Sequence, residues 1–516
     1  MMDMSDWTSE YDVVVVGSGG GALTGAYAAA ARGARTAVLE KTSRLGGTSA
    51  YSGGALWLPG TSVQERAAAG DSTDAARTYL RAVIGDSELE RQEAFVSTAQ
   101  AVVDLLEGDP NIELEWRPFP DYYARPGRQD VGRAIHAVDL DSDRIGARRI
   151  DVRPELHVDR AGYEHPDETL TGGRALIGRL TMALDGTGHA DIRLGTAVTA
   201  LIMEDGRVVG VEAHHDGVTH RIKATRGVLL AAGGIEGNAS LRGEAGTPGR
   251  AAWSMGPRGA NTGDLLCAAR EIGAATALLN EAWWCPGVAL PDGSAAFMVG
   301  VRAGMLVDAT GERYLNESLP YDQFGRAMLE RDSVVSAVPS YLIFDSRDGA
   351  PILPAISIPD VPASDHLDAG TWVQSNTLEA LAGEIGVSAD TLVSSVARFN
   401  DGAKRGVDED FARGEDPYDR FFCPPGGPDQ PNPALRQIDT APFYAARIVT
   451  SDLGTKGGVT TDADARVQSV AGHAISGLYA AGNTAASLSG SYYPGPGVPL
   501  GTAMVFAYRA VCHMLG

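Results

Sequence analysis

The sequence predicts an α/β protein in which a parallel-sheet domain is built from both ends of the chain and an α+β domain is inserted between them. The first ground for this prediction is a strand, glycine turn, helix and second strand that open the chain at residues 12–40. The second is that short apolar strands ending in glycines occur both at 227–234 and at 477–483, where an apolar helix follows after Pro499. The third is a change in composition between them, because residues 282–440 are richer in prolines, aromatic residues and loops.

Length and composition agree with this organisation. The 516 residues are enough for two to four domains of roughly 100–200 residues each. We expect one domain from residues 1–281 and 441–516 and the inserted domain from 282–440. Hydrophobic residues make up 44% of the chain, which allows a large core and excludes a disordered protein.

The charge and the cysteines restrict the setting in which the protein works. A formal net charge of −23 disfavours nucleic acid and anionic membranes as partners. The four cysteines form no CxxC pair, which indicates reduced thiols in a cytoplasmic protein. The N-terminal residues lack the basic start and apolar core of a signal peptide. No stretch approaches the roughly 20 apolar residues of a spanning helix, so no integral membrane segment is expected, and the ten histidines show no metal-ligand spacing.

The opening residues form a βαβ pattern. Residues 12–16 (DVVVV) are a short, β-branched and uninterrupted apolar run, which is typical of a buried parallel strand. A glycine turn and a helix of small residues follow, and TAVLEK at 36–41 is the next strand. Farther along, residues 200–213 predict a hairpin that turns at Asp205-Gly206.

The glycine turn itself, Gly17-Ser18-Gly19-Gly20-Gly21-Ala22, fits the GxGxxG/A pattern of dinucleotide-binding proteins. The first glycine permits a tight turn, the second lets the backbone approach a pyrophosphate, and the third position needs a small residue for helix packing. The positive end of the helix then faces the phosphates. Such a turn alone can be merely structural. Here Glu40 also ends the next strand, 18 residues after Ala22, where a carboxylate can bind the ribose.

The segment after Glu40 favours FAD over NAD. An NAD domain has no need for the glycine- and serine-rich stretch KTSRLGGTSAYSGG at 41–54. With LLAAGGIEGN and GLYAAGNT farther on, this stretch resembles the fumarate reductase and succinate dehydrogenase flavoprotein superfamily, and the resemblance implies a Rossmann-like FAD-binding domain. No histidine or cysteine lies in a recognisable flavin-attachment context, so we expect non-covalent FAD. The residues expected to bind it are Gly17, Gly19, Gly20, Ala22, Glu40, Lys41, Gly46, Gly47, Thr48, Ser49, Gly53, Gly482, Asn483 and Leu500.

At two characteristic stretches of that superfamily, this sequence differs from the fumarate reductases. The stretch GERYLNESLPYDQFGRAM at 311–328 resembles one in which fumarate reductases carry a proton-donating arginine, but the counted position is Tyr321. The stretch SDLGTKGG at 451–458 has Gly454 where fumarate reductases carry a substrate-clamping histidine. A dicarboxylate needs cationic donors. These positions supply a phenol and a glycine, which disfavours fumarate as the substrate.

A third motif, GSYYPGPGVPLG at 490–501, places a phenol before a rigid turn. The hydroxyl of Tyr493 and the backbone N–H of Gly497 would form an oxyanion hole for an enolate. The competing interpretation is a Pro/Gly turn with a packing tyrosine. Taken together, the motifs resemble the 3-ketosteroid Δ1-dehydrogenase family over essentially the whole chain. The stretches that carry this resemblance are FPDYY (119–123), SAAFMVGVR (294–302), NESLPYDQFGRAM (316–328), FDSR (344–347) and SGSYYPGPGVPLGTAMVF (489–506).

The resemblance implies an activity and four catalytic groups. Tyr321 matches the base that abstracts the C2 proton, and Tyr122 matches the tyrosine that supports this base. Tyr493 and the Gly497 amide match the pair that polarises the C3 carbonyl. Hydride would pass from C1 to flavin N5 and leave a 3-keto-1-ene steroid. The doublets Tyr122-Tyr123 and Tyr492-Tyr493 each leave an alternative one residue away, and Tyr493 is preferred because it directly precedes PGPG.

The substrate and the electron acceptor are less closely defined by the sequence. A steroid is flat and apolar and needs apolar and aromatic pocket walls. Phe119 and Phe297 lie in the matching stretches and are candidates, although both could equally be ordinary core residues, and Trp283 and Trp284 are less specific. The reduced flavin needs an external electron acceptor, such as a quinone.

Two other functions stay open. One is a related flavin oxidoreductase, such as a Δ4-(5α)-dehydrogenase of ketosteroids or an enoate-type reductase. The other is a flavoprotein without turnover. The tyrosine of FPDYY together with YPGPG favours Δ1-dehydrogenation, and a protein without turnover has no evident use for three pocket tyrosines on separate segments.

Overall fold

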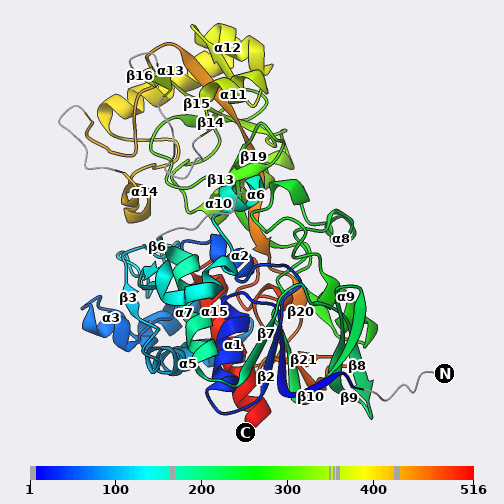
Figure 1. Cartoon of the computed structure of the whole chain (residues 1–516). Coiled ribbons are helices and arrows are strands. Elements are labelled where there is room, and N and C mark those ends of the chain that lie inside the picture. Colours follow the sequence, from blue (N-terminus) through cyan, green and yellow to red (C-terminus); the bar gives the residue numbers. More distant parts are fainter. Residues whose placement is uncertain (1–6, 163–168, 348–349, 352–354, 356–360, 424–429) are drawn as a thin grey trace. The chain divides into compact units, whose positions relative to one another are not determined.

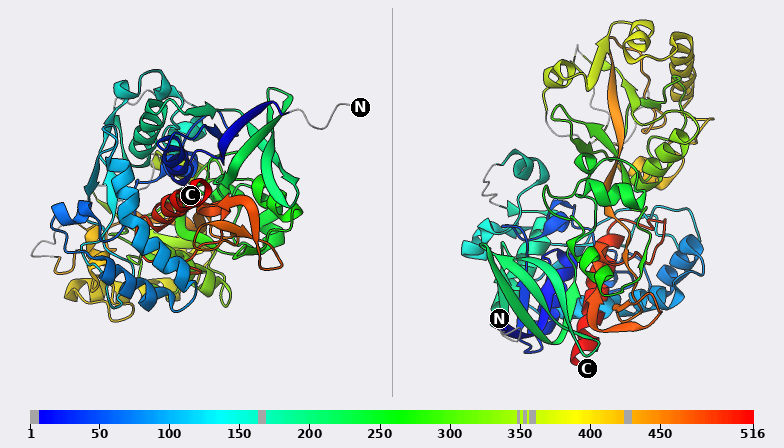
Figure 2. Two further views of the ribbon diagram at one scale, coloured as in Figure 1. Left: turned by 90° about the horizontal axis from the view of Figure 1, so that it is seen from below. Right: turned by 90° about the vertical axis from the view of Figure 1, so that its right-hand side faces the viewer.

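The computed structural model describes residues 7–162, 169–347, 350–351, 355, 361–423 and 430–516. The chain divides into two compact units (Figures 1 and 2). The first unit comprises Met1–Thr247, Gly256–Ala282 and Gly454–Gly516, and the second comprises Pro248–Met255 and Trp283–Leu453.

The boundary at which the chain goes back from the second unit to the first lies later than expected. We expected the inserted domain to end at residue 440, but β19 (Phe443–Thr455) is one continuous strand that pairs with β15 (Ser340–Phe344) and β18 (Trp372–Ser375). Most of β19 therefore belongs to the second unit. Residues 248–255 belong there too, because the N–H of Met255 and the hydroxyl of Ser254 donate to Asp452, at 2.8 and 2.7 Å.

The main sheet of the first unit runs in the order β21-β22-β9-β10-β1-β2-β7, with β8 paired to β9. The strands β10, β1, β2 and β7 are parallel neighbours, whereas β8 and β9 add antiparallel pairs, so the sheet is mixed. Its strands are β1 (Ser9–Val16), β2 (Thr36–Leu39), β7 (Ala190–Arg193), β8 (Ala197–Glu204), β9 (Arg207–His215), β10 (Val218–Leu230), β21 (Arg466–Gln468) and β22 (Ala474–Ala480).

The expected βαβ unit is present. Val13–Val16 are at most 4% exposed and pair with Thr36–Leu39 on one side and Gly227–Leu230 on the other. Burial on both faces explains why this strand is uninterrupted in its apolar character. Because β22 also pairs in parallel with β10, residues from both ends of the chain share the same sheet, as expected.

Two hairpins lead into the long strand β10. The expected turn at Asp205-Gly206 connects β8 and β9, with φ values of +48° and +76° that suit an Asp-Gly turn. A second turn at Asp216-Gly217, with φ values of +48° and +77°, connects β9 and β10. This second turn was not predicted from the sequence; because of it, β10 begins at Val218 rather than near residue 227.

Helices and short strand pairs complete the first unit. The helices are α1 (Gly20–Ala30), α2 (Gly47–Tyr51), α3 (Ser62–Arg66), α4 (Thr73–Ile84), α5 (Leu89–Glu107), α6 (Leu156–Ala161), α7 (Gly172–Gly186), α8 (Ala239–Ala245), α9 (Asp264–Glu271) and α15 (Val498–Leu515), with 3₁₀ turns at Ser142–Ile150, Ala251–Trp253 and Gly482–Thr484, of which Ala251–Trp253 belongs to the second unit. The short pairs join β3 (Leu114–Trp116) with β4 (Ile135–Ala137), β5 (Leu140–Asp141) with β6 (Thr169–Leu170), and β11 (Thr276–Ala277) with β20 (Gly458–Val459).

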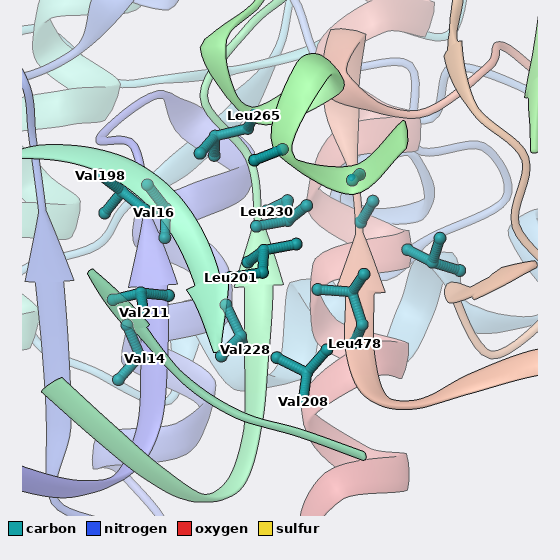
Figure 3. Packing of buried hydrophobic residues seen from close by; sticks show 14 of the residues in the cluster. Val14, Val16, Val198, Leu201, Val208, Val211, Val228, Leu230, Leu265 and Leu478 are labelled. Atoms are coloured by element: carbon teal, nitrogen blue, oxygen red, sulfur yellow. The ribbon is translucent and has the colours of Figure 1, made fainter. Parts of the chain in front are cut away.

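A hydrophobic cluster fills one side of the main sheet. Side chains of the central strands pack against those of the β8–β9 hairpin and of α9 (Figure 3). This packing fixes the carboxyl ends of β1 and β10, from which the glycine turns emerge. The residues labelled in Figure 3 are Val14, Val16, Val198, Leu201, Val208, Val211, Val228, Leu230, Leu265 and Leu478.

Helix α15 packs within the first unit. It lies beside α1 and also contacts α5, so the first and last helices of the fold are neighbours (Figure 1). Within the described part of the chain, α15 is the one helix whose length and apolar composition would allow it to cross a bilayer. Its buried residues, such as Val505 and Phe506, supply core contacts. The packing of a core helix therefore accounts for its apolar composition.

The second unit is built on its own sheet, in the order β13-β12-β19-β15-β14, with β18 paired to β19. Two hydrophobic clusters lie on this sheet, and one of them stacks Phe344 on Tyr444 and sets Trp372 against them edge-on. The remaining elements are β12 (Ala282–Ala289), β13 (Ala295–Phe297), β14 (Met305–Val307), β16 (Ser346–Arg347), β17 (Ala350–Pro351), α10 (Tyr321–Asp332), α11 (Ala363–Asp368), α12 (Leu378–Ile385), α13 (Ala389–Arg405) and α14 (Pro417–Phe421).

Candidate active site

The turn after β1 leaves no room for a side chain. Gly17 has φ +106°, and a Cβ on it would lie 2.3 Å from the backbone oxygen of Ala231. Gly19 is the N-cap of α1 and has no side chain to cap the helix, and the first turn of α1 contains no acidic residue. Its N-terminus therefore offers backbone N–H groups and a positive dipole end to an anion, which is what a pyrophosphate requires.

The tightest packing of helix α1 does not lie at Ala22, where the motif places it. Ala22, expected at the tight helix contact, is 1% exposed. The closest approaches occur at Gly21, where a Cβ would lie 2.9 Å from that of Ala503, and at Gly25, where it would lie 2.6 Å from a methyl group of Leu229. The two small residues four positions apart in α1 are the signal that the sequence offered for this contact.

The expected ribose-binding carboxylate is held by its neighbours. Glu40 is 8% exposed and accepts hydrogen bonds from Ser18 Oγ at 2.6 Å and from the N–H and hydroxyl of Thr42 at 2.8 and 2.9 Å. Ser18 Oγ also accepts from the N–H of Gly46 at 3.0 Å. Ser18 thus joins the first glycine turn, the carboxylate and the second glycine turn, a role that the sequence analysis missed. A carboxylate offers about four acceptor positions, which leaves capacity for a ribose hydroxyl.

Lys41 points into a polar pair on the first unit. Its ammonium group donates to Thr262 Oγ1 at 2.6 Å and to Asp264 Oδ2 at 2.9 Å, at the start of α9. The ammonium group of Lys41, the residue that follows Glu40, is therefore engaged by two side chains of the first unit.

The second glycine turn is tied to the first. Gly46 and Gly47 have φ values of +109° and +49° and lead into the short helix α2. Ser49 Oγ accepts a hydrogen bond from the N–H of Gly20 at 3.0 Å, and Thr48 Oγ1 accepts one from the amide of Asn261 at 2.9 Å. The two segments expected to line the flavin and its pyrophosphate are therefore fixed to each other.

The remaining expected cofactor residues show three different surroundings. A Cβ on Gly53 would have nothing within 4 Å, so this backbone borders open space. Gly482 has φ +64° and lies against Ala503, and Leu500 approaches the Cβ position of Gly20 to 3.1 Å. Asn483 lies close to Gly454, where a Cβ would come within 2.4 Å of its side-chain nitrogen.

The first unit also contains a buried pair of tyrosines. Tyr122 and Tyr493 are 4% and 3% exposed, and their rings meet edge-on with centroids 5.2 Å apart. The ring of Phe119 lies 6.2 Å from that of Tyr122. Two phenols expected on separate segments are thus neighbours, beside an aromatic wall.

The structure distinguishes the two members of each tyrosine doublet. Tyr123 and Tyr492 form a second edge-on pair, with centroids 5.9 Å apart, and Tyr492 is 41% exposed. The buried pair therefore consists of Tyr122 and Tyr493, the members of each doublet that the resemblance preferred.

Gly497 lies at the start of α15. It has φ +87°, and a Cβ on it would lie 2.4 Å from the carbonyl of Ala55. Its own carbonyl accepts hydrogen bonds from the N–H groups of Trp57 at 3.1 Å and Gly501 at 2.8 Å. The position therefore excludes any other residue, and its backbone sits at the positive end of a helix.

Tyr321 is the first residue of α10 in the second unit. It is 7% exposed, and its ring meets that of Phe297 edge-on with centroids 5.1 Å apart. Trp283 and Trp284 are each 2% exposed on β12 of the same unit. Phe297, a candidate for the wall of the steroid pocket, therefore packs against the residue that the resemblance identifies as the base.

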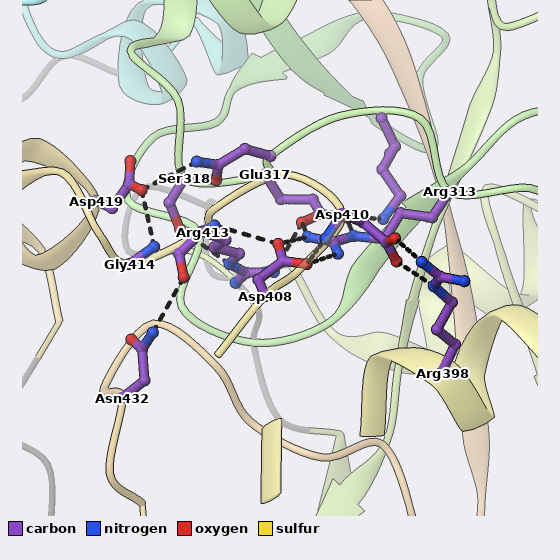
Figure 4. A network of polar contacts seen from close by, with 12 residues as sticks. Arg313, Glu317, Ser318, Arg398, Asp408, Asp410, Arg413, Gly414, Asp419 and Asn432 are labelled. Atoms are coloured by element: carbon purple, nitrogen blue, oxygen red, sulfur yellow. Dashed lines mark hydrogen bonds and ion pairs between the residues drawn. The ribbon is translucent and has the colours of Figure 1, made fainter. Parts of the chain in front are cut away.

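The loop before Tyr321 is fixed by a buried charge cluster, which we define as Arg313, Glu317, Asp408 and Arg413 (Figure 4). Arg313 donates to both oxygens of Glu317 and of Asp408 at 2.8–2.9 Å, and Arg413 donates to Glu317 at 3.0 Å. Burial alone would raise the pKa of Glu317, but the charges of Arg313 and Arg413 outweigh it and hold that pKa below its usual range. This cluster was not predicted from the sequence.

The chain matches a known protein family. The family model for the FAD binding domain matches residues 12–500 of the chain. The glycine turns, the open helix terminus and the held carboxylate fit the pyrophosphate and ribose of that cofactor. The protein is therefore an FAD-binding flavoprotein.

Individual relatives narrow this class. The chain is 49% identical to a 3-oxosteroid 1-dehydrogenase of Rhodococcus opacus, over 99% of the chain and 100% of that protein. It is 37% identical to a 3-oxosteroid 1-dehydrogenase of Mycobacterium tuberculosis, with 98% of each covered. Its fold matches, with a TM-score of 0.89, 35% identity and 98% and 99% coverage, the crystal structure of a 3-ketosteroid Δ1-dehydrogenase from Sterolibacterium denitrificans in complex with 1,4-androstadiene-3,17-dione. The chain belongs to the family of the 3-oxosteroid 1-dehydrogenases.

Proposed function

We propose that the protein catalyses the FAD-dependent 1,2-dehydrogenation of 3-ketosteroids to 3-keto-1-ene steroids. The buried edge-on pair of Tyr122 and Tyr493 carries this proposal, because the segment that bears Tyr493 leads directly into the helix whose N-cap is Gly497. The 49% identity to a 3-oxosteroid 1-dehydrogenase and the likeness to a Δ1-dehydrogenase in complex with a dienone steroid support the substrate class.

Each proposed role follows from the chemistry of a 3-ketone. Bound FAD, which we propose is held non-covalently, supplies the two-electron acceptor for the hydrogen that leaves C1. Hydrogen bonds from the Tyr493 hydroxyl and the Gly497 amide to the C3 oxygen would stabilise the enolate as it forms. Tyr321, as phenolate, would remove the C2 proton, and Tyr122 has the supporting role that the resemblance implies. Phe119 and Phe297 would pack on the apolar steroid.

The reaction can be tested with the flavin itself. Anaerobic mixing of the FAD-loaded protein with androst-4-ene-3,17-dione should bleach the flavin absorbance and produce the 1,4-diene. A saturated 5α-steroid provides the alternative substrate. Bleaching by the 5α-steroid without bleaching by the 4-ene would support a Δ4-(5α)-dehydrogenase instead. Bleaching by neither would support a flavoprotein without this turnover.

The base can be tested with one hydroxyl. Tyr321→Phe should lower kcat by roughly 10²–10⁴-fold, the usual contribution of a positioned general base, while the FAD content stays unchanged. Tyr314→Phe is the matched control, because Tyr314 lies in the same stretch but its hydroxyl is engaged with Ser340 Oγ at 2.7 Å. Near-normal turnover of Tyr321→Phe would refute its assignment as the base.

We infer that an external acceptor, such as a quinone, takes the electrons from the reduced flavin. The test is the rate at which a soluble quinone, compared with oxygen alone, restores the flavin absorbance after anaerobic reduction by steroid. A quinone-independent recovery would contradict this acceptor class.

A further inference from the structure

The turn that carries Tyr493 has little internal means of holding its shape. Its sequence is Tyr493-Pro-Gly-Pro-Gly497, and the two prolines have no N–H to donate. Gly495 lies so close to the residues beneath it that a Cβ would come within 2.7 Å of both Asp121 Oδ1 and Trp57 Nε1. The position of Tyr493 therefore depends on groups outside the turn that hold its carbonyls.

One such group is the hydroxyl of Tyr79 on α4. It donates to the carbonyl of Pro494 at 2.7 Å and accepts from the N–H of Tyr123 at 3.0 Å. The same Pro494 carbonyl accepts from the N–H of Tyr122 at 3.0 Å. Three hydrogen bonds thus meet at two oxygen atoms and join the segments that bear Tyr122 and Tyr493.

Tyr79 is itself firmly held. Its ring is fully buried and packs 6.4 Å from the indole of Trp57, and the guanidinium of Arg133 lies 5.4 Å from the ring centre. Arg133 and Trp57 both donate to the buried carboxylate of Asp121, each at 2.9 Å. Burial raises the pKa of Tyr79 far above its usual range, so its hydroxyl keeps the proton that it donates.

We propose that Tyr79 is a positioning residue for the dehydrogenation, which sets the Tyr493 hydroxyl against the C3 oxygen of the steroid by fixing the Pro494 carbonyl to the Tyr122-Tyr123 backbone. This inference rests on the proposed function. Tyr79 touches neither the steroid nor the flavin in this role. It acts through the turn, and Phe at the same position would keep the ring but lose both hydrogen bonds.

The variant Tyr79→Phe isolates the hydroxyl. The C3 carbonyl stretch of 1,4-androstadiene-3,17-dione, labelled with ¹³C at C3 and bound to the oxidised holoenzyme, reports how strongly the oxygen is polarised. In the wild type this stretch should lie below its value in water. In Tyr79→Phe most of that lowering should be lost, and kcat per bound FAD should fall roughly 10-fold, as for a misplaced catalytic group. KM should change by less than about threefold, because the loss concerns the transition state.

Tyr479→Phe is the matched control. Tyr479 is also buried in the first unit, and its hydroxyl bonds His513 Nδ1 at 2.8 Å, away from the turn. This variant should keep the wild-type stretch and kcat. An unchanged stretch and kcat in Tyr79→Phe would overturn the proposal, and so would equal losses in both variants, because these would indicate a general loosening of the fold.

Two further outcomes are distinguishable. If Tyr79→Phe yields no folded holoenzyme, Trp57→Phe tests the same support by removing the N–H that Asp121 accepts beneath Gly495. The same losses in that variant would support the proposal, and wild-type values would overturn it. Failure of the proposed function itself would appear in the wild type, as no bleaching of its flavin by a 4-ene-3-ketosteroid.

Discussion

In the first unit, the backbone at Gly17 passes so close to Ala231 that no side chain fits between them. In the second unit, the loop before Tyr321 is held by four buried charged side chains that satisfy one another. The glycine turn gains its shape from the absence of side chains, whereas the loop gains its shape from large ones. The two regions should therefore fail in different ways when altered: the first by steric exclusion and loss of cofactor, the second by exposure of an uncompensated charge.

The largest effect is expected at Gly17→Ala. The added methyl group would lie 2.3 Å from a backbone oxygen at a φ of +106°, so the strand end or the turn must move. We expect loss of bound FAD and a decrease of more than about 3 kcal/mol in the free energy of unfolding. Flavin absorbance per protein and denaturant titration measure these.

The control for this variant is Gly33→Ala. Gly33 has φ +81°, but a Cβ there has nothing within 4 Å. It therefore tests backbone strain alone, about 1–2 kcal/mol, and should keep FAD. If Gly17→Ala bound FAD as well as Gly33→Ala does, close approach would not be what shapes the glycine turn.

The next effect is expected at Glu317→Gln. Glu317 is 1% exposed and is the shared partner of Arg313 and Arg413, so the neutral side chain leaves buried positive charge without compensation. Breaking a buried ion pair costs about 3–5 kcal/mol. Denaturant titration should show this loss. Glu312→Gln, which removes an exposed carboxylate that pairs with Arg331, should change stability far less.

Acid should weaken the second region through the same carboxylates. The hydrogen bonds and charges of the arginines hold the pKa values of Glu317 and Asp408 below their usual range, against burial, which would raise them. Below about pH 4, the ordinary value for these carboxyls, the unfolded chain binds more protons than the folded one. The free energy of unfolding should therefore fall as the pH drops through that value toward the lowered ones. A stability profile that rises on acidification over this range would contradict the ion-pair account.

The smallest effect is expected at Arg398→Ala, at the edge of the same network (Figure 4). Arg398 donates to Asp410 at 2.7 Å, but its side chain is 70% exposed, and exposed ion pairs contribute little because water screens them. Denaturant titration should not resolve a change. A loss comparable with that of Glu317→Gln would mean that burial does not decide which of these charges matters.

The same contrast explains what the sequence could predict. The βαβ unit, the Asp205-Gly206 hairpin and the C-terminal helix follow from local patterns, and the structure confirms them. FAD binding, and the family to which the chain belongs, were likewise predicted from motifs.

What the sequence did not reveal depends on contacts between distant residues. The hydrogen bond from Ser18 to Glu40 is one example, because Glu40 was predicted from its own position whereas Ser18 was not. The charge cluster unites Arg313 with Asp408, which are far apart in the chain and have no shared motif. The return boundary was placed too early because nothing in the sequence around residue 441 shows with which strands β19 pairs.

The glycine at position 454 has an evolutionary consequence. It has φ +124°, and a Cβ there would lie 2.4 Å from the side-chain nitrogen of Asn483 and 3.2 Å from a carboxylate oxygen of Glu236. A histidine at this position, as the resemblance gives for fumarate reductases, would strain the backbone and would meet the Asn483 side chain where it now lies. A histidine there would therefore need the Asn483 side chain to move as well as tolerate the left-handed backbone. The glycine thus keeps this position closed to the larger side chain that the resemblance gives for fumarate reductases, unless its neighbour changes with it.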